Sequence, residues 1–189
     1  MLKTKSIWLG FLLVAISLSW ACDAATGEAN KLVDEGNAII KKNNEMTAKV
    51  SALLPDLLGE KMTKAEDLEK YKADNKAKFD ELISLCDQLE KGGNDAAAKF
   101  EQASSKLKAG DKFQEYTSVK AQEFKKRAEW DKATGAFVKS FVAEKDAEKA
   151  NDLVVAFNKT QDTMKKEADG LMEKAEKIVK DNPTMFEKK

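Results

Sequence analysis

The stretch AEKANDLVVAFNKTQDTMKKEADGLMEKAEKIVKD, residues 147–181, has the most regular apolar spacing in the chain. This spacing places one residue in every three or four on the same face of an α-helix, as is typical of helices that pack into bundles. Asp146 is suited to cap the start of the helix, and Asn182-Pro183 stops it. The sequence therefore predicts a long amphipathic helix with this face: Ala147, Ala150, Val154, Phe157, Gln161, Met164, Ala168, Leu171, Ala175 and Ile178.

The same spacing occurs near the start of the chain and predicts a first long helix. Pro55 and Gly59 are expected to end or kink this helix. Asn43 interrupts the apolar face and can fix the register of packing. The predicted face consists of Ala29, Leu32, Gly36, Ile39, Asn43, Met46, Val50 and Leu53, and it is widened by Val33, Ile40 and Leu54.

Residues 63–109 allow two interpretations. Thr63 and Glu66 have the spacing of a capping box, so a second helix is expected to start there. Gly92-Gly93 is expected to end it, followed by a short third helix over 95–109 that is anchored by Phe100, Ala103 and Leu107. The alternative is one long helix over 63–109 that tolerates both glycines.

The stretch from Lys112 to about Glu144 predicts a further long helix, for which Asp111 is a candidate cap. Large aromatic side chains bury more area than any others, so this helix is expected to lie nearest the centre of the bundle. Its aromatic residues are Phe113, Tyr116, Phe124, Trp130, Phe137 and Phe141.

These segments predict an all-α fold, an elongated antiparallel helical bundle of four long helices plus one short helix. No sustained alternation of apolar and polar residues indicates a β-strand. We expect residues 29–182 to form a single helical-bundle domain, followed by a short tail over 183–189.

The composition excludes several classes of function. The chain has 33 basic and 33 acidic residues, evenly interspersed, and therefore lacks the basic stripe that a nucleic-acid-binding protein needs. It contains no histidine and two cysteines, which removes histidine-based catalysis and the usual zinc sites. We expect no metal, no cofactor, no catalytic residue and no enzymatic activity. Carboxylate pairs such as Glu66/Asp67 and Asp80/Glu81 are typical of a solvated helix surface.

Residues 1–22 have the layout of an export signal. Lys3 and Lys5 precede an apolar run from Ile7 to Leu18, which is shorter than a membrane span, and small residues follow before Cys22. Residues 1–21 are therefore expected to be cleaved, and residues 22–28 to form a tether. Without residues 1–21 the chain has 31 basic and 33 acidic residues.

With Ala21 followed by Cys22, this segment resembles the signal of bacterial lipoproteins. That resemblance implies cleavage before Cys22, acylation of Cys22, and attachment to the membrane of the cell envelope on its periplasmic face. Ser19 and Ala21 also satisfy the small-x-small rule of ordinary signal cleavage, so a secreted or soluble periplasmic protein remains an alternative, as does an uncleaved anchor. Cys86 lies on an apolar stripe and is expected to be a buried free thiol rather than a disulfide partner of Cys22.

The function that follows is non-enzymatic contact, as a lipid-anchored scaffold, spacer or adaptor whose partner is another envelope protein. The alternative is a carrier that holds a small apolar or amphipathic ligand between helices near Phe113, Phe124, Phe137 and Phe141. A basic group around Phe124 and Trp130 could meet phosphates or lipid head groups, but it is more typical of a solvated flank. This group consists of Lys120, Lys125, Lys126 and Arg127.

Overall fold

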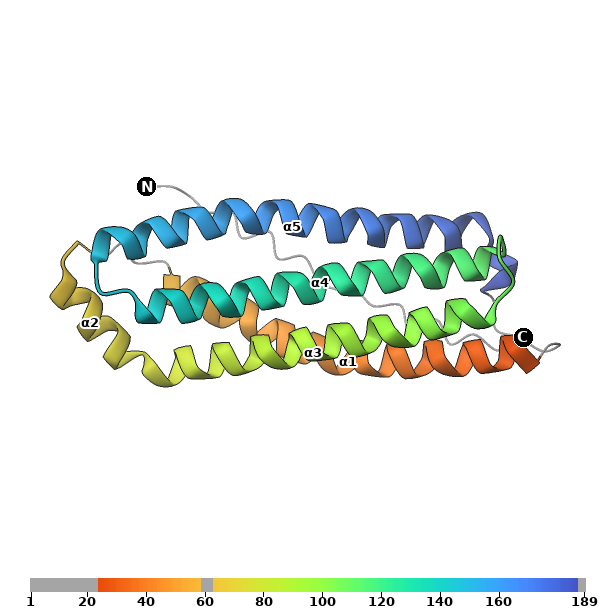
Figure 1. Ribbon diagram of the computed structural model, residues 1–189, viewed down its shortest axis with the longest axis horizontal. Helices are drawn as coiled ribbons and strands as arrows, with labels where there is room; N and C mark the ends of the chain where they lie inside the picture. The colour runs from red at the N-terminus through yellow and green to blue at the C-terminus, as the bar shows by residue number, and fades with distance from the viewer. Residues whose placement is uncertain (1–23, 59–62, 187–189) are drawn as a thin grey trace.

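The computed structural model describes residues 24–58 and 63–186, and this part of the chain is almost entirely helical (Figure 1). The predicted all-α bundle is confirmed, with four long helices and one short helix packed into an elongated body. The elements are α1 (Ala24–Leu58), α2 (Ala65–Asp74), α3 (Lys76–Lys106), α4 (Lys112–Ala143), α5 (Ala147–Asp181) and the 3-10 helix η1 (Pro183–Met185).

The long helices pack in chain order, α1 against α3, α3 against α4, and α4 against α5, each pair antiparallel (Figure 1). Ion pairs fix the register of α1 on α3, with Lys99 2.7 Å from Glu35 and Lys106 2.8 Å from Glu28. Helix α4 therefore lies between α3 and α5. Helix α3 likewise lies between α1 and α4, so the aromatic-rich helix shares the central place predicted for it with α3.

Gly92-Gly93 does not end a helix, because α3 continues through both glycines to Lys106. The glycines serve close packing instead. A Cβ atom on Gly93 would lie 3.0 Å from the Cβ atom of Ala128 in α4, and one on Gly92 would overlap the amide of Asn43 in α1. The alternative interpretation, in which the helix tolerates both glycines, is therefore correct for Gly92 and Gly93.

The short helix is α2, and the break lies at Asn75 rather than at the glycines. Both the backbone N–H and the side-chain amide of Asn75 donate to the carbonyl of Tyr71, which satisfies the last turn of α2. The predicted capping box is wrong, because Lys64 occupies the N-cap position and makes no side-chain cap. Tertiary contacts of Leu68, Tyr71 and Lys72 hold α2 in place instead.

Helix α2 closes one end of the bundle by capping two other helices. The Tyr71 hydroxyl donates to the carbonyl of Leu57 at 3.1 Å, at the C-terminus of α1. The buried Lys72 ammonium donates to the carbonyls of Val142 (3.2 Å) and Glu144, at the C-terminus of α4. A positive charge at a helix C-terminus is stabilising, because unpaired carbonyls and the helix dipole meet there.

We expect Lys72→Met to lower the free energy of unfolding by about 1–3 kcal/mol, because it keeps the buried stem but leaves two carbonyls without their charged donor. Lys70→Met, an exposed position on the same helix, is the control and should change it by less than about 0.5 kcal/mol. Urea unfolding followed by circular dichroism measures both. Equal stability of the two variants would show that the Lys72 contacts contribute nothing.

Both ends of the domain extend further than predicted. Helix α1 begins at Ala24, so the predicted tether is helical from that residue, and it continues past Pro55 to Leu58. Pro55 is exposed in the last turns, where a missing N–H costs one bond without forcing the helix to stop. After α5 the chain turns through η1, which brings Phe186 into the core instead of a free tail.

The buried side chains form two separate apolar clusters, one near each end of the bundle. The proximal cluster, nearer Ala24, contains Ala29, Val33, Ile40, Ala96, Ala97, Phe100, Ala103, Phe113, Tyr116, Val119, Ala121, Phe124, Ala175, Ile178 and Phe186. The distal cluster contains Val50, Leu54, Leu57, Leu68, Phe79, Leu82, Leu85, Cys86, Leu89, Phe137, Val138, Phe141, Ala147, Ala150 and Phe157.

Candidate functional site

The predicted lipidation residue, Cys22, lies outside the described residues, but the end of the bundle next to it is well defined. Helix α1 begins only two residues later, at Ala24. The start of α1 shares this proximal end with the connection from α3 to α4 and with the end of α5 (Figure 1). A group attached at Cys22 would therefore be joined directly to a packed helix.

Local signals in the sequence build the proximal end. Gly110 has a φ of 86°, which favours glycine, and it allows the tight turn between α3 and α4. Asp111 then caps α4 as predicted, accepting from the backbone N–H of Phe113 at 2.7 Å. Phe186 packs edge-on against Phe113 and Tyr116, with ring centroids 6.1 and 5.2 Å apart. These contacts lock the end of α5 against the start of α4.

Charges at the proximal end are largely paired. Lys106 meets Glu28, Lys112 meets Glu115 at 2.8 Å, and Lys177 meets Asp181 at 2.6 Å. Lys112 holds the pKa of the Glu115 carboxyl below its usual value, and Lys177 does the same for Asp181. These three pairs compensate Lys106, Lys112 and Lys177, whereas Lys108 and Lys180 are also exposed at the proximal end.

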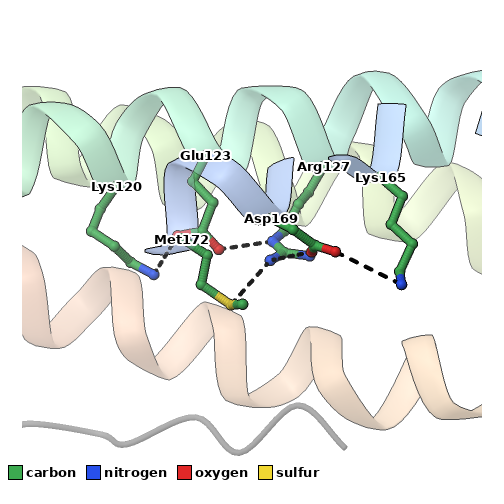
Figure 2. Close-up of polar contacts among 6 residues, drawn as sticks. All are labelled: Lys120, Glu123, Arg127, Lys165, Asp169 and Met172. Carbon is green, nitrogen blue, oxygen red and sulfur yellow. Dashed lines mark hydrogen bonds and ion pairs between the residues drawn. The ribbon is translucent and has the colours of Figure 1, made fainter. Parts of the chain in front are cut away.

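A buried group of charged side chains, which the sequence did not predict, lies midway along α4 (Figure 2). We call Lys120, Glu123, Arg127 and Asp169 the central ionic cluster. Glu123 is central: its carboxylate accepts from Lys120 at 2.6 Å and from Arg127 at 2.9 Å, and its side chain is only 3% exposed. Arg127 reaches α5, with a nitrogen 4.0 Å from Asp169 and 3.7 Å from the sulfur of Met172.

The central ionic cluster corrects one interpretation of the basic group around Phe124. Phe124 is in the core as expected, and Lys125 and Lys126 form a solvated flank. Lys120 and Arg127 are instead almost fully buried, at 10% and 12% side-chain exposure. All four cations pair with acidic side chains, so their positive charge is compensated within the bundle.

The spacing of Lys120, Glu123 and Arg127 contained the missed signal. Steps of three and four put them on the same stripe of α4 as the core residues Phe113, Tyr116 and Val138. Alternating charges at this spacing can also be a solvated helix face, and the sequence offered no way to choose. The ammonium of Lys120 lies 4.6 Å from the centroid of the Phe124 ring, a further contact that burial strengthens.

The four rings considered for a ligand site do not come together. Phe113 and Phe124 belong to the proximal cluster, whereas Phe137 and Phe141 belong to the distal cluster. Each packs on another ring: Phe124 stacks on Phe100 at 5.8 Å between centroids, and Phe137 stacks on Phe157 at 4.0 Å. These side chains fill the two halves of the core.

Cys86 is buried and free, as predicted. Burial raises the pKa of its thiol to about 12, so the reactive thiolate is scarce at neutral pH. Glu35 of α1 pairs with Lys99, which lies 13 residues along α3 from Cys86. Cys86 is therefore about 20 Å along the bundle from the level of Glu35, and further still from the start of α1.

Residues 24–58 and 63–186 contain no group of three or more Cys, Asp or Glu side chains placed to hold a metal ion. Within the same ranges, no helix combines the length and the hydropathy that crossing a bilayer requires. Comparison of the chain with protein-family models, curated proteins and solved structures gave no match.

Proposed function

We propose that this protein is a lipid-anchored component of the cell envelope that acts by non-enzymatic contact, as a scaffold or spacer. The observation that supports this most directly is the start of α1 at Ala24, two residues after the candidate acylation site Cys22. A long flexible linker would leave the bundle free to tumble above the membrane. Two residues would instead keep the start of the bundle close to the membrane surface.

The bundle has the dimensions of a spacer. Helix α1 has 35 residues, so its length is about 50 Å at a rise of 1.5 Å per residue. Helix α1 packs against α3, and its Glu28 and Glu35 form ion pairs with lysines of α3. Helix α1 is therefore held against the rest of the bundle. Anchored at its start, the protein would hold α2 at the opposite end of the body, where we expect another envelope protein to bind.

Attachment would depend on acyl chains rather than on surface charge. Two chains bury enough hydrocarbon for stable anchoring, whereas one chain gives only marginal binding. Three lysines at the proximal end are already paired with acidic side chains and add little to this. Binding of the acylated protein to vesicles should therefore depend more on the acyl chains than on the vesicles' content of anionic lipid.

Cys22→Ala tests the proposal in a bacterium that processes lipoproteins. We expect the wild-type protein to fractionate with membranes, with an intact mass that shows loss of residues 1–21 and addition of acyl chains. The variant should leave the membrane fraction, while the purified bundle keeps its helical circular dichroism, because Cys22 precedes the first described helical turn. Cys86→Ala, which removes the buried thiol, is the control and should stay with the membrane.

A different distribution would contradict the proposal. If the Cys22→Ala variant remained in the membrane fraction although its mass showed that residues 1–21 had been removed, anchoring through Cys22 would be wrong. If the wild-type protein had the mass of a cleaved but unacylated chain, it would be a secreted or soluble periplasmic protein instead.

A further inference from the structure

Helix α2 is held to the bundle by few side chains. Only Leu68 and Lys72 of its ten residues are buried, and Tyr71 is partly buried. No side chain caps its N-terminus, where Lys64 occupies the N-cap position. Isolated helices shorter than about 12–15 residues are marginal in water, so α2 is helical because these three side chains are docked.

The docked side chains of α2 cover apolar surface at the distal end of the long helices. Leu68 is fully buried and belongs to the distal cluster. The Tyr71 ring packs edge-on against Phe79 of α3, with ring centroids 6.3 Å apart, and the Phe79 ring lies 5.7 Å from that of Phe141 in α4. Displacement of α2 would therefore uncover Phe79 and the apolar side chains next to it, while the four long helices stay in place.

Backbone carbonyls surround this apolar surface. The Tyr71 hydroxyl donates to the carbonyl of Leu57 at 3.1 Å, and the Lys72 ammonium donates to the carbonyls of Val142, at 3.2 Å, and Glu144. These carbonyls lie at the C-termini of α1 and α4, where the helix dipole favours a positive charge. The Val142 side chain is 36% exposed, so apolar surface is already open next to them. We call the surface under α2 the distal socket; it consists of Phe79, Phe141 and the carbonyls of Leu57, Val142 and Glu144.

We propose that α2 is a displaceable cap and that the distal socket is a docking site in which a short cationic helix of a partner protein takes the place of α2. A cation is required because the carbonyls at the C-terminus of α4 repel an acidic group and are satisfied by an ammonium or guanidinium group. Leu68 and Lys72 show the spacing that such a helix needs, an apolar residue followed four positions later by a cation on the same face.

The position of the distal socket agrees with the contact function proposed above. Helix α2 lies at the end of the body opposite to the start of α1, so a bundle anchored there would present the distal socket away from the membrane (Figure 1). The assignment of the occupant to a partner protein rests on that proposed function. Displacement of α2 does not depend on it.

Hydrogen exchange of the purified chain, read by mass spectrometry, tests whether α2 is released on its own. Amides of residues 66–74 should be protected at least about 100-fold less than those of residues 79–100 in α3, because few buried side chains hold α2. Leu68→Ala should lower the protection of α2 by about a further tenfold and leave that of residues 79–100 unchanged. Lys70→Ala, an exposed change on the same helix, is the control. Equal protection of α2 and α3 in the wild-type protein would show that α2 leaves only on global unfolding, and would overturn the proposal.

A fluorescently labelled synthetic peptide of residues 63–75, which contains the whole of α2, tests docking. The host is the Leu68→Ala/Lys72→Met chain, whose own α2 lacks both buried groups; Leu68→Ala alone is the host if circular dichroism shows that the double variant is unfolded. Fluorescence anisotropy should show binding to the host at least about tenfold tighter than to the wild-type chain, in which α2 fills the distal socket. A peptide with Lys72→Met should bind the host at least about tenfold more weakly, because it lacks the charged donor.

Different results would overturn the proposal. They are the absence of binding of the unchanged peptide to the host, equal binding of both peptides, and a wild-type dimer that the peptide dissociates. The dimer would identify α2 of a second copy as the occupant instead of a partner protein. These measurements involve no membrane, so their failure leaves anchoring through Cys22 standing, and a failure of anchoring leaves their results unchanged.

Discussion

Replacing Glu123 with alanine is expected to lower the free energy of unfolding by about 3–5 kcal/mol. The change leaves two cations, Lys120 and Arg127, nearly buried next to each other without the carboxylate that joins them. Loss of one partner from a buried ion pair costs far more than the pair contributes, because the remaining charge cannot regain its hydration. Here a single substitution removes the shared carboxylate from two cations at once, and Arg127 keeps only its longer contact with Asp169 among the ion pairs described above.

The matched control is Glu129→Ala on the same helix. Lys126 and Glu129 have the same i, i+3 spacing as Lys120 and Glu123, at 2.8 Å, but their side chains are 41% and 54% exposed. Water can replace the lost partner there, so we expect a change below about 1 kcal/mol. Urea unfolding of both variants at pH 7 gives the comparison, and similar values would show that burial of the central ionic cluster has no energetic consequence.

Glu123→Gln refines this result. The amide keeps the volume and can still accept one hydrogen bond, but it removes the charge that faces Lys120 and Arg127. A loss nearly as large as that of the alanine variant is expected if charge compensation dominates, because both substitutions remove the charge. A clearly smaller loss would mean that the retained volume and hydrogen bond, rather than the charge, carry much of the contribution.

The helices could be predicted from the sequence because their signals are local. Apolar spacing located α5 and α4, and Asp111 and Asp146 cap them as expected. The predicted face of α1 was partly right, because Ala29, Gly36 and Val50 are buried. Its centre was displaced, because the flanking Val33, Ile40 and Leu54 are buried whereas Leu32, Ile39 and Leu53 are only partly buried. When an apolar stripe on a helix is two residues wide, the sequence does not predict which edge of the stripe packs against the neighbouring helix.

Features that depend on a neighbouring helix could not be predicted. Gly92-Gly93 has the composition of a helix end, and only the approach of Asn43 and Ala128 explains why the helix continues through it. The break at Asn75 depends on Leu68, Tyr71 and Lys72 finding partners elsewhere in the bundle. The burial of Lys120 and Arg127 likewise requires Glu123 and Asp169 to be in place. In each case the deciding contact is distant in sequence or shared among several groups.

Phe100→Ala should also be strongly destabilising, by about 3–5 kcal/mol, because the ring is fully buried and the cavity would lie inside the proximal cluster. Phe100 stacks on Phe124 and also sits over Gly36 of α1. A Cβ atom on Gly36 would lie 3.0 Å from the Phe100 ring. Gly36, a residue of the predicted face of α1 that has no side chain, thus makes room for this ring.

A double-mutant cycle with Gly36→Ala tests that relation. In the wild-type background the added methyl group is crowded by the ring, which offsets the gain in helix propensity of about 1 kcal/mol that alanine has over glycine. In the Phe100→Ala background the crowding is gone, and the methyl group also fills part of the cavity, so Gly36→Ala should be clearly stabilising. Thermal unfolding of the four proteins gives the coupling energy, for which we expect about 1 kcal/mol or more. A coupling energy near zero would mean that Gly36 is needed for some contact other than the one with the Phe100 ring.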